Sequence, residues 1–211
     1  MVKTVQDPST EEKILAAARQ VFLQKGSAGA RMQDIADAAG INKALLHYYF
    51  RSKEKLFEVI FREAITRLMP RIHEIFDHAE LDFFEKIRAF VHAYTGMAME
   101  NPYLPLFVLN EMHSNPDVFL ATVFPNHKDL PFKKAIAATE EAMKGGEIRT
   151  MEPVQLLFNI LSLALFPFIA RPMFQRVMQV SGKRYDTLLE QRQTEVADFV
   201  IHAIQIKQPK R

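Results

Sequence analysis

The stretch from Asp34 to Lys55, DIADAAGINKALLHYYFRSKEK, decides which fold we expect for this chain. Its first part places small and apolar residues on one helical face. Gly40 follows, where a sharp turn between two helices needs the positive φ that glycine adopts cheaply. Asn42 then suits the N-cap of a second helix, because its side-chain oxygen accepts hydrogen bonds from free backbone N–H groups. The pattern predicts two short helices joined by a tight turn.

The second helix divides into a buried face and an outward face. Leu46 and Tyr49 lie four and seven residues after Asn42, so we expect both side chains to pack on the first helix. The outward set is then Lys43, Ala44, Leu45, His47 and Tyr48. This layout is typical of a helix-turn-helix, whose second helix enters the DNA major groove. A plain helical hairpin within a bundle is the structural alternative.

The run GINKALLHYYFRSKEKLF, with DIADAAG before it, resembles the DNA-binding domain of TetR-type transcriptional regulators. Those proteins share D-I-A-x-x-A-G, Y-x-F-x-S-K-E-x-L or a close variant, and a preceding amphipathic helix. The resemblance covers about the first quarter of the chain. It implies an all-α protein with an N-terminal three-helix helix-turn-helix domain over residues 9–55. A connecting helix over 53–70 would lead to a larger helical effector-binding and dimerisation domain over 71–206.

The same resemblance names the candidate DNA contacts. Lys43, Tyr48 and Lys53 are the phosphate candidates, since an ammonium group supplies charge and a phenol donates one hydrogen bond. Base edges would face Ala44, Leu45 and His47, of which Leu45 offers apolar contact alone. The full candidate DNA-binding set is Arg31, Asn42, Lys43, Ala44, Leu45, His47, Tyr48 and Lys53.

The chain departs from the family before the second helix. Ala30 and Arg31 stand where Thr or Ser is usual, and alanine has no side-chain cap to offer, so we expect a softer start to that helix. Arg31 is a candidate phosphate ligand in place of a hydroxyl group, and a solvated arginine is an equal alternative.

Charge and composition are compatible with this reading. The net charge is only +2, but residues 1–55 hold nine Lys and Arg against six Asp and Glu, whereas the rest holds 18 against 19. The basic excess therefore lies with the helix-turn-helix, where phosphate contacts would supply affinity. The chain has no cysteine, which excludes disulfides and thiol chemistry, and its start does not resemble a signal peptide. We expect a cytoplasmic protein.

Beyond the helix-turn-helix every strong pattern is helical. The connecting helix is expected to end or kink at Pro70, and further helices are expected over 81–99, 104–113, 131–144, from Pro153 onward, and 185–206. The last of these carries apolar residues at Leu188, Leu189, Val196, Phe199, Val200 and Ile204.

The segment VQLLFNILSLALFPFIA, residues 154–170, is apolar almost all round. It is short for a membrane span, and polar residues and Pro167 interrupt it, so we expect no membrane association. Such a helix is either the centre of its own domain or is covered on one face by a partner subunit. With the last helix, it predicts a homodimer formed through about residues 153–206, as in the family. The alternative is that both helices close a monomer core.

No catalytic or metal-binding spacing and no phosphate-binding glycine loop occurs, so we expect neither an enzyme nor a cofactor. Aromatic and polar residues in the middle of the chain suit an apolar effector pocket, although an ordinary core suits them equally well. We expect an effector that is uncharged or weakly acidic, with apolar or aromatic bulk. The candidate effector residues are Phe90, Tyr94, Phe107, Asn110, His113, Phe158 and Asn159.

The sequence therefore predicts a regulator that binds double-stranded DNA, a repressor dimer on a palindromic operator, released by a small molecule. Two alternatives stay open: an adaptor with a helix-turn-helix but no effector, and a helical lipid- or metabolite-binding protein that no longer reads DNA.

Overall fold

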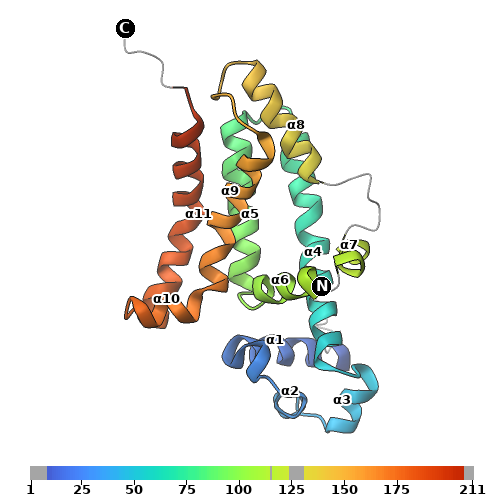
Figure 1. Ribbon diagram of the computed structural model, residues 1–211. Helices are drawn as coiled ribbons and strands as arrows, with labels where there is room; N and C mark the ends of the chain where they lie inside the picture. The colour runs from blue at the N-terminus through green and yellow to red at the C-terminus, as the bar shows by residue number, and fades with distance from the viewer. Residues whose placement is uncertain (1–8, 115, 124–130, 207–211) are drawn as a thin grey trace, which may run out of the picture. The chain divides into compact units, whose positions relative to one another are not determined.

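The computed structural model describes residues 9–114, 116–123 and 131–206 (Figure 1). These residues form helices joined by short connections, and their one β-type contact is an isolated bridge between Ile148 and Gln205. The all-α prediction is confirmed. The helices are α1 (Thr10–Gly29), α2 (Met32–Ala39), α3 (Lys43–Tyr49), α4 (Lys53–Asp77), α5 (Phe83–Glu100), α6 (Leu104–Ser114), α7 (Pro116–Val123), α8 (Pro131–Lys144), α9 (Pro153–Ile169), α10 (Arg171–Val177) and α11 (Gly182–Ile204).

The chain divides into two compact units, Met1–Ala64 and Ile65–Arg211, and the division falls inside α4. Helix α4 runs past Pro70 to Asp77, so of the two outcomes expected at that proline, an end or a kink of the helix, the end is wrong. Proline removes the N–H that would reach the Thr66 carbonyl, but Thr66 is exposed, where water can satisfy it. Ile72 and Ile75 continue the buried stripe and hold the last two turns in place.

The first unit has a core shared by α1, α2, α3 and the start of α4. Ser9 and Glu12 form the capping box that opens α1. The Phe22 ring of α1 stacks on Phe57 of α4 with ring centroids 3.8 Å apart, and both side chains are fully buried. Gly26 interrupts α1 with φ 67°, a value that favours glycine.

The second unit is built around α5, which packs against both α9 and α11, as the green, orange and dark red helices of Figure 1 show. Val91 and Thr95 are fully buried on α5, and the Thr95 hydroxyl donates to the Val91 carbonyl oxygen (2.6 Å). The turn after α8 is tied to the end of α11, because the Arg149 N–H donates to the Ile204 carbonyl oxygen (2.9 Å).

Within this single chain, helix α9 is buried on one side and exposed on the other. Leu156, Ile160, Ala164 and Phe168 are buried, whereas Phe158 and Phe166 are 55% and 51% exposed. The possibility that α9 is the fully enclosed centre of its own domain is therefore wrong for a single chain. On α11 the Phe199 side chain is 66% exposed within the single chain. Val196 and Val200 of the same helix are buried and belong to the core of this unit.

Two helices, α7 and α10, were not expected from the sequence. Among the described residues no single helix is long and apolar enough to cross a membrane. Helices α9 and α10 meet that criterion of length and composition only as a pair, which is bent by 68°.

Candidate nucleic-acid interface and effector cavity

The turn between α2 and α3 has the geometry that the sequence predicted. Gly40 adopts the left-handed conformation (φ 68°, ψ 31°), and the next N–H, from Ile41, donates to the Ala36 carbonyl oxygen (3.0 Å). Asn42 caps α3, since its Oδ1 accepts the Leu45 N–H (2.8 Å). Ala36 is fully buried, as close crossing of two short helices requires.

The two faces of α3 are separated almost as expected. Leu46 is fully buried, but Tyr49 is 41% exposed, so the prediction that Tyr49 packs on α2 was wrong. Phe50 is buried instead. The helix ends at Tyr49, and the extended backbone of Phe50 (φ −133°, ψ 108°) places residue 50 rather than 49 in the core. All five residues of the expected outward set are exposed: Lys43, Ala44, Leu45, His47 and Tyr48, the last at 80%.

The start of α2 is capped from within the helix. The Arg31 N–H donates to Asp34 Oδ2 (3.1 Å), and Lys25 Nζ lies 2.8 Å from Asp34 Oδ1. The hydrogen bond from Lys25, followed by that from Arg31, lowers the pKa of the Asp34 carboxyl group. Asp34 thus satisfies the N–H of Arg31, the N-cap residue, whereas no side chain of the N-cap residue accepts the N–H groups of the first turn, and the Arg31 side chain is exposed.

Lys53 opens α4, and its Nζ approaches the Ala30 carbonyl oxygen (3.4 Å). Two backbone N–H groups in the first turn of α4, those of Glu54 and Lys55, have hydrogen-bond acceptors within this chain. Ser52 Oγ accepts the Lys55 N–H (3.3 Å). A backbone hydrogen bond at Glu54 itself, with Ser52 contributing, lowers the pKa of the Glu54 carboxyl group. A phosphate at this helix terminus would therefore meet an ionised carboxylate.

Comparison with known proteins identifies this arrangement. Residues 14–60 match the family model "Bacterial regulatory proteins, tetR family", a match that runs from α1 into α4. This chain therefore carries the DNA-binding domain of the TetR family of transcriptional regulators. Regulators of this family bind DNA and act as dimers.

The relatives of this chain match it over different lengths. The repressor NicS of Pseudomonas putida is 43% identical over 79 residues, which are 37% of this chain and 34% of that protein. The regulator RutR of Escherichia coli O157:H7 is 26% identical over 151 residues, 71% of this chain and 69% of that protein.

Solved structures extend the likeness in fold to nearly the whole chain. The ketosteroid regulator KstR2 of Mycobacterium tuberculosis has a TM-score of 0.70 at 17% identity, over 96% of this chain and 98% of that one. PfmR of Thermus thermophilus has a TM-score of 0.65 at 22% identity, over 90% and 97%.

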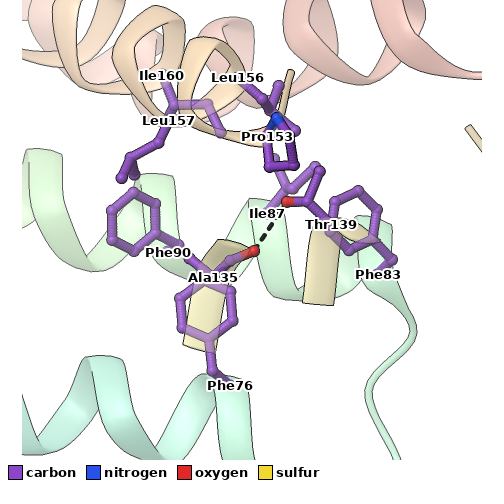
Figure 2. Close-up of a pocket in the computed structure, with 10 residues that line it drawn as sticks. All are labelled: Phe76, Phe83, Ile87, Phe90, Ala135, Thr139, Pro153, Leu156, Leu157 and Ile160. Carbon is purple, nitrogen blue, oxygen red and sulfur yellow. Dashed lines mark hydrogen bonds between the residues drawn. The ribbon is translucent and has the colours of Figure 1, made fainter. Parts of the chain in front are cut away.

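The second unit contains a small apolar cavity between α4, α5, α8 and α9 (Figure 2). Its volume of about 20 Å³ is little more than one water molecule needs. No charged residue lines it, and the Thr139 hydroxyl donates to the Ala135 carbonyl oxygen of its own helix (2.8 Å), which leaves the cavity without an outward donor. Its lining residues are Phe76, Phe83, Ile87, Phe90, Ala135, Thr139, Pro153, Leu156, Leu157 and Ile160.

Of the effector candidates, one lines this cavity. Phe90 does so, and Tyr94 stacks on Phe90 with ring centroids 5.6 Å apart without itself lining the space. Burial raises the pKa of Tyr94 to about 12, so its hydroxyl stays protonated. The remaining candidates lie elsewhere: half-buried Phe107 and exposed Asn110 and His113 on α6, and exposed Phe158 and Asn159 on the outer face of α9.

An exposed ion pair joins α8 to α4 next to a residue that lines the cavity. Lys134 Nζ donates to both carboxylate oxygens of Asp77 (2.7 and 2.6 Å), which joins the first turn of α8 to the last residue of α4. Ala135 directly follows Lys134 and lines the cavity. At the far end of α8, Gly146 has φ 71°. No sequence pattern indicated this ion pair, because 57 residues separate its members.

Proposed function

We propose that this chain is a homodimeric TetR-family repressor that binds a palindromic operator and is released from it by an uncharged, apolar small molecule. Its place of action is then the cytoplasm, with the DNA. Two features of the chain together carry the proposal. The first unit presents an exposed α3 with a capped N-terminus, and the second contains an apolar cavity to which α4 contributes Phe76.

DNA contact is assigned to the exposed face of α3 and its flanks. Lys43, Tyr48 and Lys53 would hold phosphates, while Ala44, Leu45 and His47 would meet base edges. Arg31 is free to approach a phosphate because only its backbone N–H serves the cap of α2. Asn42 is assigned the role of N-cap of α3 rather than of a base contact, since its Oδ1 accepts the Leu45 N–H.

Dimerisation is assigned to the outer faces of α9 and α11. Phe158 and Phe166 on α9 and Phe199 on α11 are more than half exposed in the single chain. Large apolar side chains gathered on neighbouring helices are typical of a subunit interface. A two-fold axis through this surface would also supply the symmetry that a palindromic operator requires.

Release by an effector is assigned to the cavity. Phe76 of α4 lines it, and α4 is one continuous helix that begins at Lys53, a DNA-contact candidate. In this proposal a ligand enlarges the cavity by displacing Phe76, and with it the end of α4. The ligand shifts the equilibrium only as far as it binds the enlarged state more tightly than the closed one. The lining has no charged group to pair with an ionised ligand, so the effector is uncharged.

The test is a titration of the protein with DNA from upstream of its own coding sequence, against scrambled DNA, at two salt concentrations. We expect preferential binding to the upstream DNA that persists at the higher salt, because base contacts do not depend on counterion release. Equal binding to both DNAs that collapses at the higher salt, followed by failure to select any motif from random DNA, would contradict a role in sequence reading.

A further inference from the structure

The ring of His47 is held in one tautomer. His47 lies in the last turn of α3 on its exposed face, and its Nδ1 is 3.2 Å from the carbonyl oxygen of Arg51. A carbonyl oxygen accepts and never donates, so Nδ1 carries the hydrogen. In the neutral ring Nε2 is then an acceptor, and it has no hydrogen-bond partner among the described residues.

This acceptor is distinctive among the outward groups of α3. Asn42 Oδ1 is occupied by its cap, and Lys43 only donates. Ala44 and Leu45 are apolar. The hydroxyl of Tyr48 rotates, so it either donates or accepts according to what it meets. Within this set, His47 is the residue whose outward-facing atom, Nε2, is fixed as a hydrogen-bond acceptor by a contact inside the protein.

We infer that His47 is a specificity-determining residue that reads the operator by accepting a hydrogen bond at Nε2 from the exocyclic amino group of adenine or cytosine in the major groove. The inference rests on the proposed entry of α3 into that groove. Adenine N6 and cytosine N4 donate there, whereas guanine O6 and N7 and thymine O4 accept and would repel the Nε2 lone pair.

The expected readout is degenerate in a defined way. At one position of each half-site, one strand should carry adenine or cytosine in preference to guanine or thymine, with little choice between the first two. A single net hydrogen bond supports a discrimination of roughly three- to tenfold. Two-fold symmetry places the same preference on the opposite strand of the other half-site.

The experiment selects operators from random duplex DNA with the full-length wild-type protein and His47→Leu. The matched control is His92→Leu, an exposed histidine on α5 to which no binding role is assigned. We expect His47→Leu to lose the adenine-or-cytosine preference at that position and to keep the others, while the control selects the wild-type motif. His47→Gln, whose amide both accepts and donates, should narrow the same position to adenine.

A second titration tests the contact directly. Replacing the contacted adenine by purine, which lacks the N6 amino group, should weaken wild-type binding roughly three- to tenfold and leave His47→Leu unchanged. The inference is overturned if wild type and both His47 variants select one identical motif, or if the lost preference is for guanine or thymine. If the wild type selects no motif at all, DNA reading by α3 fails, and the inference fails with it.

Discussion

Arg192 of α11 donates from Nη2 to the carbonyl oxygen of Leu163 in α9, the carbonyl that Pro167 leaves without a helical donor. In an uninterrupted helix the N–H of residue 167 would make this hydrogen bond, and proline has none. A second group of α11 acts one turn further on, where the Tyr185 hydroxyl donates to the Pro167 carbonyl oxygen (2.9 Å). Helix α11 thus supplies the one hydrogen bond that Pro167 removes from α9, and a second one to a carbonyl group in the last turn of α9.

This relationship predicts a thermodynamic coupling between Arg192 and Pro167. Arg192→Met leaves the Leu163 carbonyl unsatisfied and should lower the free energy of unfolding by about 1–3 kcal/mol. In a Pro167→Ala background the restored N–H takes over, so the same change should cost clearly less. Urea unfolding at one fixed protein concentration measures both. Arg184→Met, on an exposed arginine of α11, is the control. An equal cost of Arg192→Met in both backgrounds would contradict the assigned role.

Lys43 is expected to act through its charge. Lys43→Gln should weaken binding to all DNA sequences alike and reduce the slope of log affinity against log salt by about 1, because one phosphate contact is lost. Titrations at several salt concentrations on the selected operator and on unrelated DNA measure this effect. Lys144→Gln, on an exposed lysine at the end of α8, should leave the slope unchanged. A sequence-dependent loss from Lys43→Gln would instead indicate base reading.

Asp34 makes the helix-turn-helix sensitive to acid. Its pKa is lowered from 3.8, chiefly by the hydrogen bond from Lys25, so the stabilisation is present above pH 3.8 and is lost as the pH falls below it. Asp34→Asn should therefore show a shallower fall of melting temperature than the wild type from pH 5 downward through this range. Thermal unfolding over that series is the measurement, with Asp37→Asn in the same helix as the control. Parallel curves for wild type and Asp34→Asn would refute the assignment.

The ion pair between Lys134 and Asp77 should slow the entry of ligands into the cavity. With N-phenyl-1-naphthylamine, an uncharged fluorescent probe, Lys134→Gln and Asp77→Asn should each raise the association rate about two- to fivefold, the range that an exposed ion pair supports. Exchanging the two residues should restore the slow rate. Lys133→Gln, on the exposed neighbouring lysine, is the matched control. Unchanged stopped-flow rates in both single variants would show that α8 does not gate the cavity.

Phe199 should be central to the dimer. Phe199→Glu places an unpaired charge in the proposed interface and should raise the dimer dissociation constant at least about 30-fold. Sedimentation equilibrium measures the change, and specific DNA binding should weaken with it. Leu23→Glu, on an apolar residue of α1 that is also exposed, should leave the dimer intact. If Phe199→Glu dissociates no more readily than the wild type, the interface lies elsewhere.

The sequence by itself determined the helix-turn-helix. Gly40, Asn42 and Leu46 were placed correctly because a positive φ, a side-chain cap and a four-residue spacing are local properties, decided within one or two turns of chain. Tyr49 was placed wrongly for a related reason. Where α3 ends, the extended backbone of Phe50 rather than helical spacing decides which side chain enters the core.

Tertiary structure alone decided the rest of the candidate site. The cavity takes Phe76, Phe90, Thr139 and Leu156 from four helices, and the pattern of each helix fits an ordinary core equally well. The pairs Lys134–Asp77 and Arg192–Leu163 join residues 57 and 29 positions apart, distances over which no local spacing carries information. Which face of the evenly apolar α9 is buried depended likewise on where α5 and α11 pack, because a helix without a polar stripe has no orientation of its own.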